Sequence, residues 1–322
     1  MSKVKLLYEL GALGRDAIHI VGGKAAHLGA LIKKNIPIPE GFVLSTSSFE
    51  RFLNRSPFLH KIRELLDKEI PLTEITQTSK QLQNYILESE FPSDLKQPIV
   101  KRYQELKEQD TSILVAVRSS ANVEDLSKTS FAGQADTFLC ISTPEELINS
   151  IKKCWASLYS SRALMYIQQM IKVPFNLVSM GVVIQKMVRS EVSGVMFTAN
   201  VLNKDRNQVL INATCGFGEC IADGKVEPDS ITVDKTTFKI IKTRIGTKVK
   251  MSIKNPEMDG TILIDTPMKQ QQILCLTEGQ IRDLVQYGIE IENLFDDAPQ
   301  DIEWAIEDGQ IKILQARNIT HL

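Results

Sequence analysis

The sequence predicts an α+β protein built from two lobes, with a boundary near residue 176. Residues 46–108 are polar and mostly helical in pattern, with breaks at prolines, whereas short apolar runs typical of strands dominate from about residue 177 onward. The chain has 322 residues, of which 43% are hydrophobic, so it can bury a sizeable core as one large or two medium domains. We therefore expect an N-terminal lobe over 1–176 and a C-terminal lobe over 177–322.

The composition excludes several classes of partner. Lysine and arginine total 38 against 39 acidic residues, and this balance predicts neither a nucleic-acid nor an anionic-membrane surface. The five cysteines form no C-x-x-C pair and no zinc spacing, so we expect reduced, mostly buried thiols in a cytosolic protein. The chain shows no secretory signal and no run of about eighteen apolar residues, so we expect no membrane span and a cytoplasmic location.

The N-terminal lobe is predicted from four local signals. A glycine pair at 22–23 leads into a helix, and the apolar stretches 42–44 and 112–118 are typical of buried strands. A short strand is expected at 136–139. A threonine cap at Thr143, with proline next and glutamate three residues after the cap, then predicts a helix start.

The C-terminal lobe is predicted to be rich in strands. Residues 180–188 and 194–199 are expected to form antiparallel strands joined through 190–193. A second capping box, Thr277–Gln280, predicts a long helix. Further strands are expected at 208–213, 230–233, 238–242, 301–307 and 310–317.

Lys24 is the first candidate for binding phosphate. Gly22 and Gly23 let the backbone approach an anion, the helix N-terminus offers free N–H groups, and Lys24 adds a positive charge. The pattern is not a Walker A loop, because Ile18 and Ala25 stand where that loop has glycine and serine or threonine. Taken alone, Gly-Gly-Lys fits a solvated turn better than a phosphate site.

Two further candidates lie downstream. Arg118 ends a buried strand and needs a negative partner, either an internal carboxylate or a ligand phosphate. Residues 131–134, Phe-Ala-Gly-Gln, are expected to form either a flap whose backbone N–H groups cover phosphates or an ordinary turn.

The terminal hairpin supplies metal-ligand chemistry. Glu303 and Gln315 carry oxygen atoms of the kind that Mg²⁺ prefers when it is shared with phosphates, and Arg317 follows. A strict two-residue turn at Asp308-Gly309 would place Glu303 and Gln315 on opposite faces, and the apolar pattern slightly favours this turn. A three-residue loop with a bulge would place Glu303, Gln315 and Arg317 on one face, with Glu303 and Gln315 as diagonal neighbours. The metal hypothesis requires a bulge.

Eight short motifs, taken together, resemble one known family. They occur in order as G-G-K-A-A-H-L-G, V-R-S-S-A-N-V-E-D, S-F-A-G-Q-A-D-T-F-L, Q-K-M-V, S-G-V-M-F-T-A, C-G-F-G-E, D-I-E-W and L-Q-A-R-N-I-T. Over nearly its whole length the chain is similar to the N-terminal nucleotide-binding domain of phosphoenolpyruvate synthase, pyruvate phosphate dikinase and rifampicin phosphotransferase. The resemblance implies an α+β ATP-grasp fold, with ATP between the two lobes.

The resemblance also implies roles for individual residues. Carried over position by position, Lys24, Arg118 and Arg317 would contact phosphate and act in catalysis. Gly133 and Thr137 would lie on the flap and the strand above the phosphates. Gln185 would meet the adenine side of ATP, and Glu303 and Gln315 would hold Mg²⁺.

In this family a histidine on a separate swivelling domain attacks the β-phosphate of ATP. AMP leaves, and the phosphohistidine passes its group to pyruvate or to a drug such as rifampicin. The chemistry of the nucleotide domain is positioning and charge neutralisation. The resemblance therefore implies an ATP-dependent phosphotransferase whose histidine domain and acceptor domain lie on another polypeptide or outside this sequence.

The match departs from the family pattern at a few positions. Ala25 replaces a usual glycine, Asn200-Val201 stands where members carry Asp-Pro, and Asn318 stands where they carry proline. None of the four histidines lies in a segment like that of the phosphorylated histidine. Two other functions stay open: a stand-alone ATP-grasp kinase or ligase acting on a small molecule, and a non-catalytic ATP sensor. The final acceptor and the oligomeric state are not determined by the sequence.

Overall fold

The computed structural model describes residues 5–108, 110–123, 136–320 and 322. Its contacts divide the chain into two compact units, each composed of two segments. The first unit comprises Met1–Ala30 and Glu40–Met187, and the second comprises Leu31–Pro39 and Val188–Leu322. The chain thus changes unit after Met187, eleven residues beyond the predicted boundary, because the strand at 180–186 pairs within the first sheet.

A five-stranded antiparallel sheet forms the centre of the first unit, in the order β1-β2-β5-β3-β4. The strands are β1 (Leu7–Glu9), β2 (Gly41–Leu44), β3 (Val115–Ala121), β4 (Thr137–Ile141) and β5 (Met180–Lys186). The α-helices are α1 (Ile18–Val21), α2 (Gly23–Ile32, whose last two residues belong to the second unit), α3 (Thr46–Arg55), α4 (Leu59–Leu66), α5 (Ile75–Glu88), α6 (Ser93–Lys107), α7 (Pro144–Ser157) and α8 (Ser161–Tyr166).

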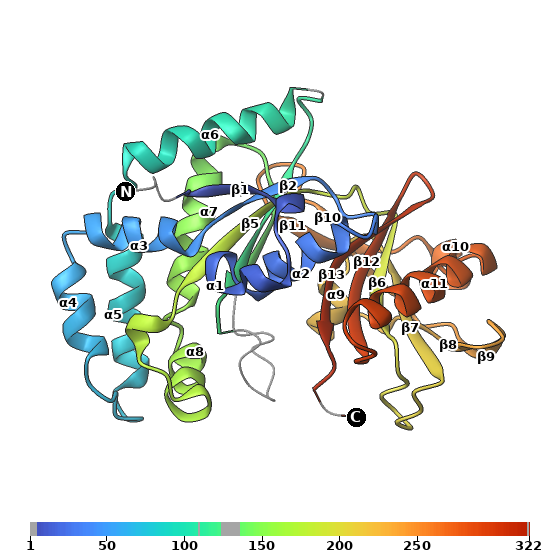
Figure 1. Cartoon of the computed structure of the whole chain (residues 1–322). Coiled ribbons are helices and arrows are strands. Elements are labelled where there is room, and N and C mark those ends of the chain that lie inside the picture. Colours follow the sequence, from blue (N-terminus) through green and yellow to red (C-terminus); the bar gives the residue numbers. More distant parts are fainter. Residues whose placement is uncertain (1–4, 109, 124–135, 321) are drawn as a thin grey trace. The chain divides into compact units, whose positions relative to one another are not determined.

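One face of this sheet carries the hydrophobic core of the first unit. Helix α7 packs against β3, β4 and β5, and α5 packs against α7 (Figure 1). Phe42, Val117 and Ile184 point from the sheet into this core, and the indole of Trp155 on α7 is completely buried there. Because side chains alternate across a strand, the neighbouring positions Ala116, Arg118 and Gln185 project from the other face.

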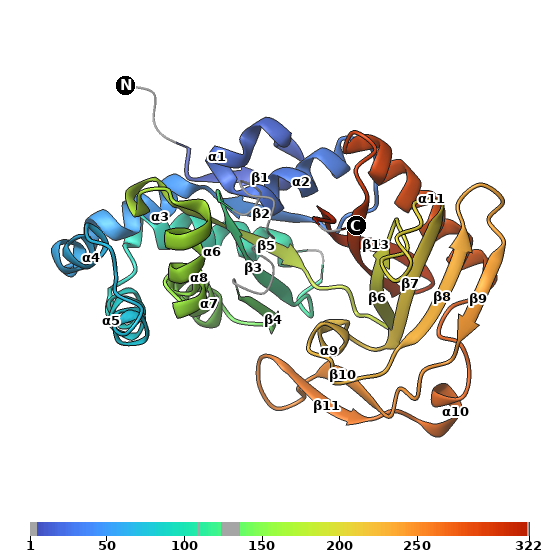
Figure 2. The ribbon, with the colours of Figure 1, turned by 90° about the horizontal axis from the view of Figure 1, so that it is seen from below.

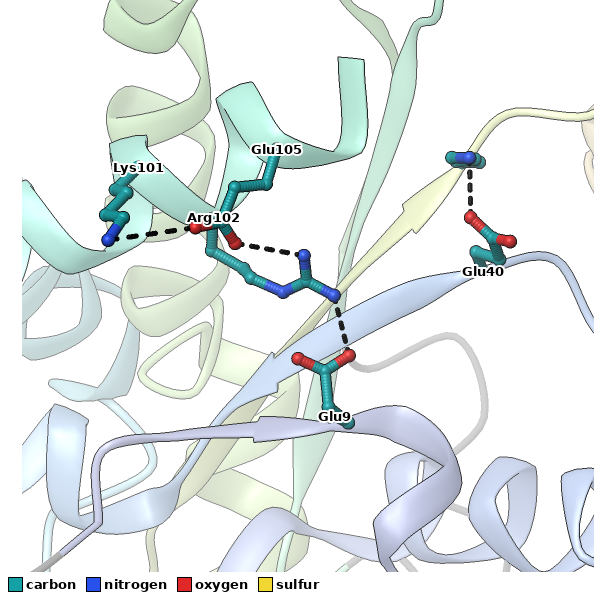
Figure 3. A network of polar contacts seen from close by, with 6 residues as sticks. Glu9, Glu40, Lys101, Arg102 and Glu105 are labelled. Atoms are coloured by element: carbon teal, nitrogen blue, oxygen red, sulfur yellow. Dashed lines mark hydrogen bonds and ion pairs between the residues drawn. The ribbon is translucent and has the colours of Figure 1, made fainter. Parts of the chain in front are cut away.

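Ion pairs connect the ends of β1 and β5 to neighbouring parts of the first unit. The Arg102 guanidinium on α6 donates to Glu9 at the end of β1 (2.7 Å) and to Glu105 one turn away (3.1 Å), as Figure 3 shows. Lys186 at the end of β5 pairs with Glu40, just before β2, at 2.6 Å. Exposed pairs of this kind contribute about 0–1 kcal/mol each, so they orient the edge more than they stabilise the fold.

A six-stranded antiparallel sheet forms the centre of the second unit, in the order β13-β12-β6-β7-β8-β9 (Figure 2). Its strands are β6 (Val192–Phe197), β7 (Gln208–Cys215), β8 (Asp229–Asp234), β9 (Ile240–Arg244), β12 (Gln300–Glu307) and β13 (Gln310–Asn318). The remaining elements are the hairpin of β10 (Lys250–Lys254) with β11 (Thr261–Asp265), and the helices α9 (Glu219–Ala222), α10 (Met268–Gln271) and α11 (Glu278–Leu294).

Helix α11 covers the apolar face of this sheet and contacts β6, β12 and β13. Trp304 and Ile302 from β12 pack there with Ile291 from α11, all of them fully buried. Gly194 on β6 lies beneath Trp304, since a Cβ atom at residue 194 would be 2.6 Å from the indole ring. The position of Trp304 therefore fixes which face of β12 is apolar.

The two predicted helix starts are confirmed. The Thr143 hydroxyl accepts a hydrogen bond from the Glu146 amide at 3.2 Å. Thr277 and Gln280 form a reciprocal capping box at the start of α11. Within the described residues, no helix is long and apolar enough to cross a membrane.

The predicted antiparallel pairing of 180–188 with 194–199 is wrong. Strand β5 pairs with β2 and β3, whereas β6 pairs with β7 and β12. Both strands are largely apolar and buried, so the pattern of either one is compatible with many neighbours. The pairing was decided by long-range contacts, which a local pattern does not encode.

Candidate functional site

Lys24 lies at the start of α2, where the chain leaves α1 through Gly22. Gly22 has φ 81° and ψ 167°, a backbone conformation open almost only to glycine. A Cβ atom at this position would lie 1.9 Å from the Ser120 carbonyl oxygen, so the glycine also permits a close approach to β3. The expected glycine-to-helix connection is confirmed, and it brings the lysine beside the end of β3.

Two serines of β3 hold the start of α2 in place. The Ser120 hydroxyl accepts a hydrogen bond from the Ala25 amide at 3.0 Å, which satisfies one of the N–H groups left free at the helix start. The Lys24 ammonium donates to the Ser119 carbonyl oxygen at 2.7 Å. The sequence predicted roles for Lys24 and Arg118 but not for Ser119 and Ser120, although these serines directly follow Arg118 in the chain.

Arg118 and Thr137 are direct partners across β3 and β4. Gln185 on β5 is the direct partner of Ala116, which lies two residues before Arg118 on β3. Because paired residues and alternate residues share a face, Arg118, Thr137 and Gln185 all project from the face opposite the core. Arg118 is 7% exposed and Gln185 is 2% exposed, so two polar groups are buried on this face, which they share with the fully buried Val43 and Val183.

The predicted flap falls outside the part of the chain that the structure describes. Gly133 and the rest of 131–134 lie in the segment 124–135. The role expected for Gly133 therefore stays a prediction. Thr137, also assigned to this region, opens β4 and is described.

The turn of the β12–β13 hairpin is the strict two-residue form. Glu307 pairs with Gln310, and both Asp308 (φ 50°) and Gly309 (φ 72°) adopt the left-handed conformation that such a turn needs. The apolar pattern favoured this turn, and the structure confirms it. The alternative of a three-residue loop at the tip is wrong.

A β-bulge nevertheless occurs further along the hairpin. Trp304 pairs with Ile313, but the next residue of β12, Glu303, pairs with Gln315, so Leu314 is the extra residue. Glu303 and Gln315 are therefore direct partners on one face, rather than the diagonal neighbours that were expected. The geometric condition for a shared metal site is met, although the bulge lies away from the turn.

Asp301 and Arg317 extend the same polar face. They are the next direct pair, two residues beyond Glu303 and Gln315, and the Arg317 Nε and Nη2 donate to one oxygen of Asp301 at 2.8 and 2.6 Å. Burial raises the pKa of Asp301, and the nearby Glu303 carboxylate adds to the rise, while Arg317 opposes it. Sequence reasoning missed Asp301, although its spacing of two from Glu303 already places both carboxylates on one face.

The donor set of this face suits Mg²⁺. It presents a carboxylate from Glu303 and an amide from Gln315, and the Oδ1 atom of Asp301 is buried with no hydrogen-bond partner among the described residues. A magnesium site commonly takes one or two protein carboxylates and completes its coordination with water and phosphate oxygens. Among the described residues, no group of three or more His, Cys, Asp or Glu side chains is arranged to hold a metal ion.

Comparison with known proteins identifies the family of the chain. The family model described as "Pyruvate phosphate dikinase, AMP/ATP-binding domain" matches residues 18–322. A probable phosphoenolpyruvate synthase of Methanocaldococcus jannaschii is 36% identical over 99% of this chain and 27% of its own length. The phosphoenolpyruvate synthase of Pyrococcus furiosus is 35% identical over 96% of this chain and 43% of its own length.

The chain thus spans less than half the length of these two relatives. Among solved structures, D-alanyl-alanine synthetase A of Vibrio cholerae aligns with 76% of this chain and 54% of its own, at 11% identity and a TM-score of 0.29. The family match covers nearly all of the chain and includes every candidate residue from Lys24 to Arg317. The chain belongs to the pyruvate phosphate dikinase AMP/ATP-binding domain family.

Proposed function

We propose that this chain binds ATP with Mg²⁺ as the nucleotide-binding part of a dikinase-type phosphotransferase. In the proposed reaction, a histidine on a separate domain attacks the β-phosphorus of ATP, takes the pyrophosphoryl group, and releases AMP. Transfer of the γ-phosphoryl group to water releases inorganic phosphate and leaves a phosphohistidine, whose β-phosphoryl group is then passed to pyruvate or to a drug such as rifampicin. The observation that carries the proposal is the polar face of the β12–β13 hairpin, where Glu303 is opposite Gln315 and Asp301 is opposite Arg317.

The first unit supplies two cations for phosphate and a polar group for the base. Arg118 and Lys24 are both brought to β3, since Arg118 is part of that strand and the Lys24 ammonium donates to the carbonyl of the next residue, Ser119. An arginine presents a planar fork that matches two phosphate oxygens, and a lysine adds a point charge. Thr137 and Gln185 project from the same face of the sheet. We assign Gln185 to the adenine side and Thr137 to the phosphate side.

The second unit supplies the metal ligands. Glu303 and Gln315 would hold Mg²⁺, with Asp301 beside them and Arg317 contacting phosphate. The ion would neutralise phosphate charge and orient the phosphate oxygens that it shares with the protein. Asp301 accepts two hydrogen bonds from Arg317 and so holds the guanidinium in one orientation on this face.

The proposed contribution of the chain to catalysis is electrostatic. Attack at the β-phosphorus breaks the bond between the α- and β-phosphates, and negative charge develops on the oxygen that leaves with AMP. Fixed cations such as Lys24, Arg118 and Arg317 stabilise such charge without any covalent step in this domain. In the proposal, the nucleophilic histidine belongs to a separate domain. The ATP-grasp fold is part of this proposal.

The proposal is tested by supplying the missing nucleophile. The purified chain is incubated with ATP and MgCl₂, with and without candidate histidine domains, and AMP and acid-labile phosphohistidine are measured. We expect AMP and phosphohistidine only when a histidine domain is present, and their loss in Lys24→Met but not in the exposed control Lys33→Met. AMP or ADP formation by the chain alone with a small-molecule acceptor would instead identify a stand-alone kinase or ligase. ATP binding without turnover under every condition would identify a sensor.

A further inference from the structure

Cys215 and Cys275 meet in the second unit, away from the hairpin that carries the proposed metal ligands. Cys215 is the last residue of β7, and Cys275 lies two residues before the cap of α11. Their Sγ atoms are 3.7 Å apart. The residues are sixty positions apart in the chain, so the tertiary fold, not a local motif, brings the two thiols into contact.

The backbone of Cys275 is anchored by a buried ion pair. The Cys275 amide donates to Asp229 Oδ2 at 2.8 Å, and the other oxygen of that carboxylate accepts from Lys248 and from the Gly246 amide. Asp229 and Lys248 are completely buried. A buried carboxylate that accepts hydrogen bonds from three groups is rigidly held, so Cys275 is fixed in place opposite Cys215.

The same surroundings distinguish this pair from Cys154 and Cys220. The hydrogen bond from Cys275 lowers the pKa of Cys215 despite its burial; the Lys248 ammonium also lowers it, while the Asp229 carboxylate opposes this. The Cys275 thiol is correspondingly harder to ionise, and its pKa is raised. Burial raises the pKa of Cys154 and of Cys220, and buried thiols of that kind react slowly.

We propose that Cys215 and Cys275 form a reversible intrachain disulfide when the protein meets a hydroperoxide. The Cys215 thiolate attacks one peroxide oxygen, which breaks the O–O bond and gives a sulfenic acid and hydroxide. The Cys275 thiol then attacks the sulfenic sulfur, forms the S–S bond and releases water. Overall, two thiols are oxidised by two electrons, and one hydrogen peroxide is reduced to two waters.

The geometry needs little adjustment for this bond. A disulfide requires sulfur atoms about 2.05 Å apart, so from 3.7 Å the sulfurs need to approach by less than about 2 Å. Rotation about the Cα–Cβ bonds supplies movements of this size. Cys275 is partly exposed, so solvent reaches the pair from its side although Cys215 is only 6% exposed, whereas Cys154 and Cys220 are fully buried.

The experiment uses the whole chain and does not depend on ATP turnover. The reduced protein is treated with graded hydrogen peroxide, its free thiols are counted after denaturation, and non-reducing peptide maps are read by mass spectrometry. We expect the thiol count to fall from five to three in one step, with a peptide linking residues 215 and 275, and dithiothreitol to restore all five. The proposal is overturned if the thiols disappear without that linked peptide, if another pair is linked, or if all five remain.

Variants separate the roles of the two thiols. In Cys275→Ser, Cys215 has no resolving partner, so we expect sulfinic and sulfonic acid at residue 215, which dithiothreitol does not reverse. Cys220→Ser, in the same unit and outside the pair, should form the linked peptide like the wild type. Because the wild-type map is decisive by itself, failure of either variant to fold leaves the test intact.

Discussion

Glu303 and Gln315 are direct partners across the β12–β13 hairpin, and one extra residue, Leu314, makes them so. Ile313 and Ala316 both pack in the core although they are three residues apart, which strict alternation forbids. The bulge at Leu314 resolves this conflict and turns Gln315 to the polar face. The core packing of β13 and the proposed metal site are therefore set by the same irregularity.

The Glu303 carboxylate should make ATP binding depend on Mg²⁺. Glu303→Gln keeps the size of the side chain and removes its charge, so we expect ATP affinity in saturating Mg²⁺ to fall roughly 10- to 100-fold. With Mg²⁺ chelated, variant and wild type should bind ATP alike. Isothermal titration calorimetry measures both conditions. Glu257→Gln, on the exposed connection between β10 and β11, is the matched control, and an equal loss there would contradict the assignment.

Gly22 should be far less tolerant of substitution than another glycine with positive φ. In Gly22→Ala the new Cβ meets the Ser120 carbonyl oxygen in a backbone conformation that is open almost only to glycine, so we expect a loss of about 3 kcal/mol or more in the free energy of unfolding. Gly224 also has positive φ, but a Cβ atom at that position would have no atom within 4 Å, so Gly224→Ala should cost about 1 kcal/mol. Urea denaturation measures the loss in the free energy of unfolding for both variants. Equal losses would show that the contact of Gly22 with β3 is unimportant.

Arg317 should stabilise the fold in a pH-dependent way. Burial raises the pKa of Asp301 above its ordinary 3.8, so the protonated acid favours the folded state at low pH, and this contribution is lost as the pH rises through the folded-state pKa. Arg317 opposes that loss by pairing with the carboxylate. We therefore expect Arg317→Met to cost about 1–3 kcal/mol at pH 7, and progressively less as the pH falls toward 3.8.

The measurement is the free energy of unfolding of Arg317→Met and wild type at several pH values. Arg244→Met, which breaks an exposed pair with Glu227, serves as the control and should cost little at any pH. A cost of Arg317→Met that does not change with pH would show that the arginine does not act through Asp301.

The buried Lys248–Asp229 pair should be essential to the second unit. In Lys248→Met the Asp229 carboxylate loses its cation while it remains fully buried, and we expect a loss of about 3–5 kcal/mol. Lys250 forms a pair with Asp265 in which both side chains are exposed, so Lys250→Met should cost less than about 1 kcal/mol. Chemical denaturation compares the two variants, and similar costs would refute a structural role for the buried pair.

Local signals predicted some elements well. Thr143 and Thr277 begin helices because a capping side chain acts within four residues of itself, so its effect can be predicted from a short stretch of sequence. The partners of β5 could not be predicted in this way. An apolar strand fits any apolar neighbour, and β2 and β3 lie far from β5 in the chain.

The candidate site was partly predictable for the same reason. Lys24, Arg118, Glu303 and Gln315 carry the positive charges and oxygen atoms that binding phosphate and magnesium would need, and these groups are evident from the sequence. Asp301 was missed, because its importance comes from being the direct partner of Arg317, and that pairing depends on the bulge. A hairpin of identical composition without the bulge would place Gln315 on the core face.

The sequence by itself determined the chemical groups and the order of the motifs, and its apolar pattern favoured the two-residue turn at Asp308-Gly309, because these depend on residue type and near neighbours. Only the tertiary structure decided that Glu303 is opposite Gln315. Trp304 lies over Gly194 and Ala316 packs beside Ile302, and these contacts with the rest of the second unit fix the apolar face of each strand. The bulge follows because burying both Ile313 and Ala316 requires one residue more than a regular strand allows.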